Sequence, residues 1–329
     1  MRKRTRYSLT GVGVFLALLV IALILRKEAP PECARLLPES DAILYFNLKP
    51  IRLVTHFDRP EVVRSPELQR FMDATGIVFE RDLDRAAFAL HRMPDPNGPN
   101  GPVAYSEVFE GRVDGHRLTA YLRGQSSSTE TYAGHEVFSI PLEGRTLRVA
   151  MLGYDMVAAS NAPTTEQIHS ILDRYRAAAS PFAGSSLLGA HYSEVPLLSE
   201  AWGIGKVGLP FSDQGKLKLL GLTLPIAADT TFVASVRYLH ALHLRVEEIA
   251  PDDAQAAESA AALEQILGLV KGLEQNAPQP QPPQDAAVNQ LIESLKVERT
   301  HNRTVVTGVV PPEMFKNVEE IPEAQAAGK

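Results

Sequence analysis

The chain has 329 residues, of which 45% are hydrophobic, 22% are charged and one is a cysteine. The first 28 residues hold six of the 33 basic side chains and one of the 39 acidic ones, so the rest of the chain has 27 basic and 38 acidic side chains and a net charge of −11. This charge disfavours both nucleic acid and anionic lipid surfaces as partners of the body, because phosphates repel it. A single cysteine excludes an internal disulfide, so the fold must depend on a hydrophobic core.

An uncharged apolar run opens the chain, from Leu9 to Leu25. As a helix these 17 residues would be roughly 26 Å long, which is near the lower limit for crossing a hydrocarbon core. The run ends in charged residues and prolines and not in a small-x-small cleavage site, which favours an uncleaved anchor over a cleaved signal. A lipid-modified Cys33 is disfavoured because Pro30, Pro31 and Glu32 precede it. We therefore expect residues 9–25 to span a lipid bilayer.

Charge predicts the orientation of this anchor. Four basic residues lie among residues 1–8, which we expect to be a cytoplasmic basic stub. The remainder would then lie in the periplasm, anchored in the bacterial inner membrane. Residues 26–38, with Pro30 and Pro31, are expected to form a stalk. Cys33 would be a spare, unpaired thiol in that stalk, with an intermolecular disulfide as the alternative.

Residues 39–200 are expected to form a first α+β half. Ser65, Pro66 and Gly76 have the cap, first-turn and end positions of a helix. The segment Met93–Pro102 holds four prolines and cannot be regular structure, and a mobile surface insertion is favoured over a binding loop. Alternating patterns predict strands at 41–49, 83–92, 103–113, 135–143 and 146–160, and helical patterns predict helices at 66–75, 114–124 and 164–178.

Residues 201–318 are expected to form a second α+β half, followed by a disordered tail at 319–329. Glycines and prolines at 201–225 predict short strands and turns, with the apolar side chains there favoured as core over an exposed hairpin that contacts lipid or a partner. The later elements are a long or hairpinned strand at 230–249, a helix at 252–275, a proline-rich linker at 276–285, and a helix and a hairpin that turns near His301 and Asn302. No regular βαβ alternation is present, which favours a mainly antiparallel α+β fold with packed helices.

One internal similarity suggests a duplicated α+β unit. Gly111, Val113 and Leu118 have the same spacing as a second set, which consists of Gly308, Val310 and Phe315. Each set ends a predicted strand. Chance similarity between strand ends remains the alternative.

The sequence assigns no catalytic, cofactor-binding or metal-binding residue. His240 and His243 form H-x-x-H, but on a strand they point to opposite faces. Ser185 and Ser186 do not lie in a G-x-S-x-G motif. The segment Gly203–Gly208 lacks the Ser or Thr of a phosphate loop, and the pair Asp82 and Asp84 is favoured as a capping pair over an acid-base pair.

The order of these pieces resembles an uncharacterised group of signal-anchored exported proteins of soil-type bacteria such as the acidobacteria. The resemblance is carried by the segments "LLPESDAILYFNL", "ATGIVFERDLDRAAFAL", "YAGHEVF", "TTFVASVRYLHALHLRVEE" and "SLKVERTHNRTVVTGVVPPEMF". It covers most of the chain after the anchor but consists of apolar patterns that define a fold. It implies no activity and no site residues.

Two functions follow as hypotheses. The first is a membrane-tethered, non-enzymatic extracytoplasmic domain that binds a protein, lipid or polymer of the cell envelope. The second is an envelope hydrolase whose active site is assembled from distant Asp, Glu, Ser or His residues. A deep polar cleft with converging carboxylates or a Ser-His pair would favour the hydrolase.

Overall fold

The computed structural model describes residues 29–55, 64–142, 144–177, 184–206, 217–219, 222–227, 229–275 and 283–312. The predicted stub at 1–8, the predicted anchor at 9–25 and the predicted tail at 319–329 lie outside the described residues. Within the described ranges, no helix combines the length and the apolar character that a membrane span needs.

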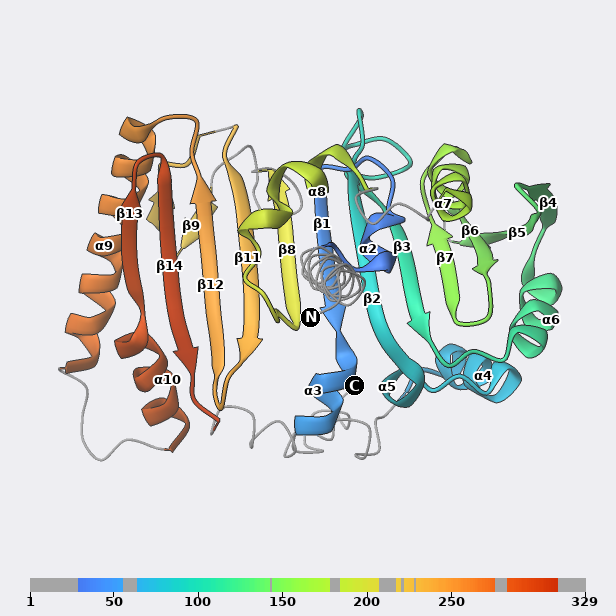
Figure 1. Ribbon diagram of the computed structural model, residues 1–329, viewed down its shortest axis with the longest axis horizontal. Helices are drawn as coiled ribbons and strands as arrows, with labels where there is room; N and C mark the ends of the chain where they lie inside the picture. Colours follow the sequence, from blue (N-terminus) through green and yellow to red (C-terminus); the bar gives the residue numbers. More distant parts are fainter. Residues whose placement is uncertain are drawn as a thin grey trace, which may run out of the picture.

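One large antiparallel sheet of twelve strands dominates the fold, in the order β13-β14-β12-β11-β8-β1-β2-β3-β7-β6-β5-β4 (Figure 1). Its strands are β1 Ala42–Asn47, β2 Leu83–Arg92, β3 Val103–Gly111, β4 Ser128–Tyr132, β5 His135–Leu142, β6 Arg145–Leu152, β7 Met156–Ser160, β8 Ala201–Lys206, β11 Thr231–Tyr238, β12 Leu242–Ile249, β13 Lys296–Thr300 and β14 Arg303–Val310. A separate hairpin pairs β9 Leu217–Leu219 with β10 Leu222–Leu224. The predicted antiparallel α+β class is confirmed.

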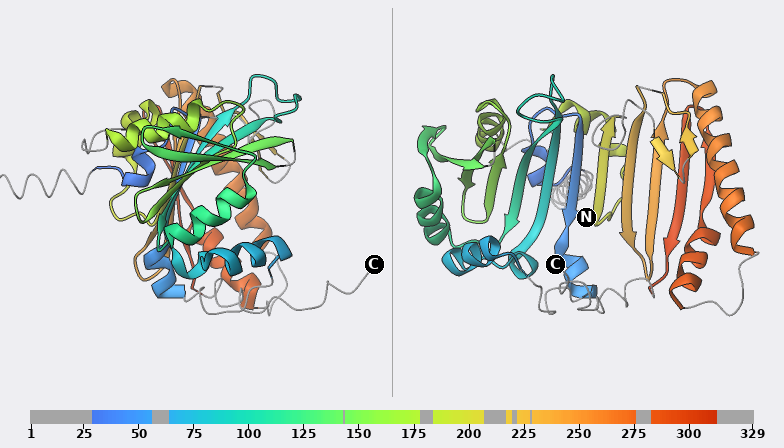
Figure 2. Two further views of the ribbon diagram at one scale, coloured as in Figure 1. Left: turned by 90° about the vertical axis from the view of Figure 1, so that its right-hand side faces the viewer. Right: turned by 180° about the vertical axis from the view of Figure 1, so that it is seen from behind.

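Helices pack on both faces of this sheet. They are α2 Glu32–Arg35, α3 Leu48–Thr55, α4 Pro66–Thr75, α5 Phe79–Asp82, α6 Gly115–Gln125, α7 Glu166–Arg176, α8 Ser186–His191, α9 Asp253–Gln275 and α10 Pro283–Ser294, with the 3-10 turn η1 Tyr192–Glu194. The face toward the viewer in Figure 1, here the front face, carries α2, α7 and α8. Figure 2 shows α4, α6, α9 and α10 on the back face.

Strand alternation explains why both faces are covered. On β5, Val137 belongs to the core cluster that includes α2 and α7, whereas the next residue, Phe138, belongs to the cluster under α6. Successive side chains of a strand point to opposite faces, so a strand that is apolar at consecutive positions needs cover on both sides. The α7 side chains Ile168, Ile171 and Leu172 are fully buried, as the helical pattern predicts.

Capping residues set the helix ends where the sequence predicts them, with one exception. Ser65 Oγ accepts a hydrogen bond from Leu68 N at the start of α4, and Gly76 ends that helix with a φ of 75°. Gly76 suits this left-handed position because it has no Cβ. The prediction that Gly124 ends α6 is wrong, because the helix continues to Gln125 and Ser126 is its cap.

The two outermost strands of the sheet are polar. Edge strand β4 was not predicted, because its sequence STETY lacks an apolar alternation and is almost wholly exposed. At the opposite edge, β13 carries Lys296, Glu298 and Arg299 as exposed side chains. The hairpin of β13 and β14 turns at His301 and Asn302, as predicted.

The predicted stalk at 26–38 is too long. Glu32–Arg35 forms α2, and Cys33 and Leu37 are completely buried against β1, β2 and β3. Residues 32–37 are therefore part of the folded body, because apolar side chains next to an open sheet face gain free energy by covering it. Burial raises the pKa of the Cys33 thiol to about 12, so this cysteine is a core residue and not an exposed thiol.

Both halves of the sheet have the same strand order. From the centre outward, one half runs β1-β2-β3-β7-β6 and the other runs β8-β11-β12-β14-β13. Along the chain, α6 follows the third strand of the first half, β3, before the outer pair β6 and β7. In the second half, α9 and α10 follow β12 before the outer pair β13 and β14. Gly111 ends β3 but Gly308 lies within β14, and these strands have different places in the two halves. The spacing noted in the sequence therefore does not join equivalent positions.

A carboxylate lies among aromatic side chains on the back face of the central sheet. Glu107 of β3 is opposite Phe88 of β2 in the ladder, and Phe88 contacts Phe46 and Phe109 edge-to-face at centroid distances of 6.1 and 5.7 Å. Burial raises the pKa of Glu107 above its usual range, because a charge loses hydration there. Ionising this group therefore works against folding.

We expect Cys33 to be unreactive in the folded protein. A pKa near 12 leaves about a thousandfold fewer thiolates at neutral pH than the usual value of 9, and the sulfur is also buried. Reaction with an aromatic disulfide reagent should be absent in buffer and complete in denaturant. Tyr154→Cys, at an exposed turn position, should react at once and serves as the control. Rapid labelling of the folded wild type would contradict a buried α2.

Replacing Glu107 by Gln should stabilise the protein in a pH-dependent manner. The pKa of Glu107 in the folded state is raised above the unfolded value of 4.5. The free-energy cost of burying the ionised carboxylate is therefore absent below pH 4.5 and is complete above the folded-state pKa. Glu107→Gln should therefore raise the free energy of unfolding at about pH 7 and not at about pH 4. Urea unfolding followed by Trp202 fluorescence measures this. Glu298→Gln, at an exposed position, should change the free energy of unfolding at neither pH. A Glu107→Gln effect that does not depend on pH would contradict a raised pKa of Glu107.

Candidate functional site

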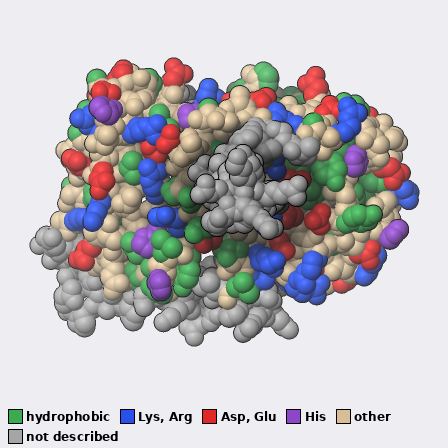
Figure 3. Space-filling view, in the orientation of Figure 1, with side chains coloured by type: hydrophobic (Ala, Val, Ile, Leu, Met, Phe, Trp, Pro, Cys, Tyr) green, Lys and Arg blue, Asp and Glu red, His purple; other side chains and the backbone are tan. Residues whose placement is uncertain are grey.

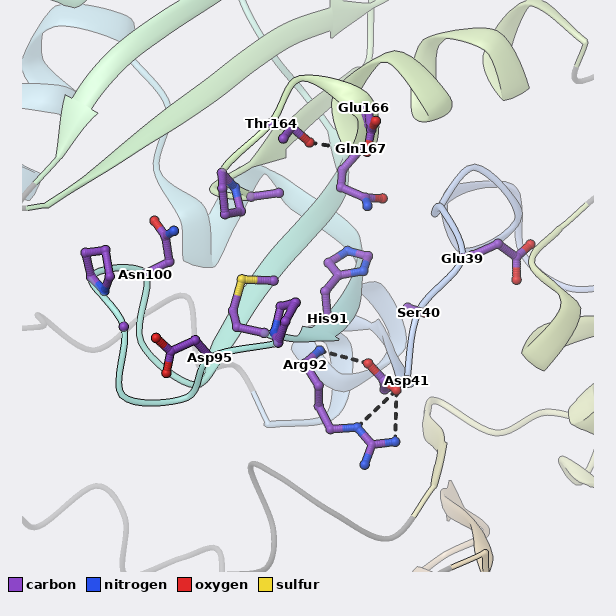
Figure 4. Close-up of a pocket in the computed structure, with 16 residues that line it drawn as sticks. Glu39, Ser40, Asp41, His91, Arg92, Asp95, Asn100, Thr164, Glu166 and Gln167 are labelled. Carbon is purple, nitrogen blue, oxygen red and sulfur yellow. Dashed lines mark hydrogen bonds and ion pairs between the residues drawn. The ribbon is translucent and has the colours of Figure 1, made fainter.

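A cavity of about 680 Å³ opens at one end of the central strands (Figure 4). Three segments form it: residues 39–41 before β1, the end of β2 with the β2–β3 loop at 91–100, and the β7–α7 connection with the start of α7 at 162–167. These segments are far apart in the sequence but meet because β1, β2, β3 and β7 are consecutive in the sheet. We call this the β2–β3 cavity.

The proline-rich β2–β3 loop is held in place by hydrogen bonds. Met93 N donates to Pro102 O at 3.0 Å, which closes the base of the loop. Gly101 N donates to Gly98 O at 2.9 Å within it. Arg145 of β6 reaches across and donates to Val103 O at 2.8 Å and to Asn100 O. The prediction that this segment has no regular structure is confirmed, and the loop forms one wall of the cavity.

The charges that line the cavity are mainly negative. The lining includes four carboxylates and one guanidinium, and these are Glu39, Asp41, Asp95, Glu166 and Arg92. Asp41 accepts from both Arg92 N at 2.8 Å and Arg92 Nε at 3.0 Å, so this pair fixes the start of β1 to the end of β2 (Figure 4). Because Asp41 is paired with Arg92 and Glu39 with Arg174, the negative charge that favours positive or neutral polar ligands comes from Asp95 and Glu166.

Glu39 joins the cavity to α7 and α8. Its carboxylate accepts from Ser186 Oγ at 2.6 Å, from Ser186 N and from Arg174 Nη2 at 2.9 Å. Burial opposes ionisation, but the hydrogen bonds from Ser186 and Arg174 outweigh it, so the pKa of Glu39 lies below its usual range. Glu39 is therefore ionised at neutral pH.

A buried His-Ser-Ser chain lies beneath the cavity floor. His91 lines the cavity, and its Nε2 lies 2.9 Å from Ser106 Oγ, which lies 3.1 Å from Ser160 Oγ. Burial lowers the pKa of His91, and the charge of Asp41 and a hydrogen bond to the Glu39 backbone only partly offset this effect. The imidazole is therefore neutral. Ser106 and Ser160 are 0% and 1% exposed and do not line the cavity.

A second, shallower cavity of about 490 Å³ adjoins the first along α7. Glu166 lines both cavities. The second contains a stack of the Tyr132 and His169 rings with centroids 3.7 Å apart, and His169 Nε2 lies 2.8 Å from Glu130 Oε1. An aromatic face beside carboxylates is a surface on which a cation or a sugar ring can pack.

The residues that the sequence singled out do not gather into a site. His240 lies in the β11–β12 turn, while His243 lies on β12. Gly203 belongs to strand β8 and not to a phosphate loop. Within the ranges that the structure describes, no cluster of three or more His, Cys, Asp or Glu side chains could hold a metal ion.

The serine and aspartate pairs have structural roles. Ser185 caps α8 by accepting from Leu188 N, and Ser186 binds Glu39. Asp82 Oδ2 accepts from Val78 N at the start of α5, and Asp84 pairs with Arg52 at 3.0 Å. The predicted capping pair is wrong as a pair: Asp82 is the last residue of α5 and bonds back to Val78 N, whereas Asp84 lies on β2 and forms an ion pair.

The sequence contained one usable signal for the cavity. His91 follows the apolar run of β2 and lies just before the proline-rich loop. A titratable side chain at the base of such a loop is a reasonable candidate for a binding residue. Ser106 lies 15 positions after His91, and Ser160 lies a further 54 positions along the chain, so only the strand order brings the three together.

No protein-family model and no curated protein matches this chain. Among solved structures it is similar to crystal form III of a protein called TP0453, at 11% identity and a TM-score of 0.44, over 88% of this chain and 98% of that one. Crystal forms IV and I of the same protein give 11% and 10% identity and TM-scores of 0.45 and 0.43, over 88% of this chain and 96% of theirs. The function is therefore argued from the site itself.

Proposed function

We propose that this protein is a membrane-tethered, non-enzymatic binding domain of the bacterial cell envelope. Residues 9–25 anchor it in the inner membrane with residues 1–8 in the cytoplasm, and the folded body lies in the periplasm. The observation that supports binding most directly is the β2–β3 cavity, which combines apolar walls with four carboxylates. The anchor itself rests on the length and flanking charges of its sequence.

The chemistry of the cavity defines the class of ligand. Met93, Pro94 and Pro163 supply apolar walls, and Asn100 and Gln167 supply amide groups that both donate and accept hydrogen bonds. Acidic side chains at the rim attract amines. These features fit an amine-bearing or polyhydroxylated unit of an envelope polymer or lipid headgroup better than an anionic ligand.

The hydrolase hypothesis has one observation in its favour, the 2.9 Å contact of His91 with Ser106. A nucleophilic hydroxyl must reach a substrate, however, and Ser106 is 0% exposed. Its second neighbour is Ser160 Oγ, another buried hydroxyl. We therefore interpret this chain as the hydrogen-bonded floor of a binding cavity.

We further propose that the body arose by duplication of one α+β unit. The equal strand order of the two halves supports this, with β1 and β8 as equivalent central strands. Strands β4 and β5 would be additions to the first unit, at the edge that carries α6 and α7. The β2–β3 cavity would then be a feature that the first half acquired.

Topology is tested first, with a reporter fused after Lys329. Alkaline phosphatase, which is active only outside the cytoplasm, should be active, and a fluorescent reporter that matures only in the cytoplasm should be dark. The protein should also remain in the membrane fraction after an alkaline wash. Replacing the apolar run by that of a cleavable signal should release the body. A membrane-free wild-type protein would contradict the anchor.

Ligand binding is tested with a photo-crosslinking amino acid at Asn100, on the cavity wall. In growing cells this position should yield a discrete adduct, because a bound ligand lies against it. The matched control is Tyr154, which is 95% exposed on the β6–β7 turn. Asp95→Lys should reduce the Asn100 adduct severalfold if the ligand is cationic. Equal labelling at both positions, or no adduct at Asn100, would contradict the proposal.

A further inference from the structure

Four large apolar side chains are exposed on two turns at the other end of the central strands. They are Leu197 at 62%, Leu198 at 82%, Tyr238 at 43% and Leu239 at 47% exposure, and we call them the leucine edge. The first two precede β8, and the last two belong to the end of β11 and the turn to β12. A contiguous apolar patch of this kind on a soluble body marks a contact surface.

Hydrogen bonds through Glu200 hold the two turns together. Glu200 N donates to Val236 O at 2.9 Å, and Glu200 Oε2 accepts from Tyr238 N at 2.9 Å. Glu200 O also accepts from Asn47 N at 2.6 Å, which ties the end of β1 to the same place. Helix α3 follows β1 and lies at this end of the strands (Figure 1), and its Leu53 is 70% exposed.

The backbone at this edge is strained. Leu198 has a φ of 64° and His240 a φ of 65°, a left-handed conformation that bulky side chains rarely adopt. Such strain persists only where the surrounding structure enforces it, and it is concentrated at sites of function. Here the strained turns hold Leu198 and Leu239 out in the solvent.

The charged groups beside the leucine edge are of both signs, and one carboxylate, Asp84, is already paired with Arg52 of α3 at 3.0 Å. Lys49 of α3 and Arg237 of β11 flank it, and His240 and His243 lie on the β11–β12 hairpin. A second carboxylate, Glu200, is already engaged with Tyr238 N. Figure 3 shows hydrophobic and histidine side chains together at the lower edge of this face. Because these carboxylates are engaged, the edge presents basic and apolar groups on an acidic body, a composition that suits anionic lipid headgroups.

The chain length keeps the body close to a membrane. Six residues, 26–31, separate the predicted anchor from the buried helix α2. An extended chain of that length reaches roughly 20 Å at most. Both α2 and the α8–η1 segment that leads to Leu197 lie on the front face (Figure 1).

We propose that the leucine edge inserts into the interfacial layer of the bilayer that residues 9–25 span, with Lys49 and Arg237 against anionic phospholipid headgroups. This inference rests on the proposed anchor. The body is then held at a fixed angle to the membrane by two points of contact, the anchor and the edge. The β2–β3 cavity, at the other end of β1, faces away from the lipid.

The test uses full-length protein in vesicles of phosphatidylethanolamine and phosphatidylglycerol that contain nitroxide-labelled lipids. A bimane fluorophore is attached at Leu197→Cys or, as a matched control, at Leu269→Cys, an α9 position that is 57% exposed on the back face. Wild-type protein serves as the labelling blank, because Cys33 is buried. Lipid nitroxides should quench the Leu197 label severalfold more than the Leu269 label. Exchange of phosphatidylglycerol for phosphatidylcholine should reduce that difference.

The outcomes separate the two proposals. If an alkaline wash strips the protein from the vesicles, the anchor is wrong and the inference falls with it. If the protein stays but the two labels are quenched equally, the anchor stands and the leucine edge does not touch lipid. If the Leu197 label is shielded from solvent in native membranes but not in vesicles, and if it crosslinks to one protein there, the edge binds a protein partner and lipid insertion is overturned. The variant Leu198→Gly, which relieves the strain, should fold normally and show reduced quenching at Leu197.

Discussion

The pairing of β1 with β8 is the constraint on which the rest of the molecule depends, because it joins two half-sheets that have the same strand order. The junction is tight: a Cβ at Gly203 would lie 2.7 Å from Leu44 Cδ2, and one at Gly205 would lie 2.7 Å from Ala42 Cβ. Glycine is needed at both positions for the strands to pair with their larger neighbours in place. On the front face, Trp202 stacks on Tyr45 with centroids 5.3 Å apart and closes the same junction.

The position of β1 also relates the two candidate surfaces to one another. Asp41, directly before β1, lines the β2–β3 cavity, and Asn47, its last residue, bonds to Glu200 at the leucine edge. A six-residue strand spans about 20 Å, so the two surfaces are separated by about the length of β1. In the proposed arrangement, the cavity lies at the end of the sheet away from the bilayer, and the sheet between the two surfaces supplies rigidity.

The sequence was informative where local rules act and silent where distant segments meet. Alternation and caps predicted β2, β3, α4, α7 and α9, because each pattern is complete within its own segment. The short helix α2 was taken for a stalk, since the burial of Leu37 depends on strands that lie far along the chain. Strand β4 was missed because exposed polar residues carry no period. The cavity could not be predicted either, because the strand order that brings residue 41 beside residue 92 is a property of the whole sheet.

If the protein is tethered as proposed, the charged outer strands have a consequence for neighbouring copies on the membrane. Tethered proteins are confined to two dimensions, where neighbours collide often and in similar orientations. A twelve-stranded sheet with bare apolar margins would polymerise edge to edge under such crowding. Glu130 on β4 and the alternating charges of Lys296, Glu298 and Arg299 on β13 put hydrated side chains on both margins. In that proposed state, each copy of the protein can remain separate at high surface density.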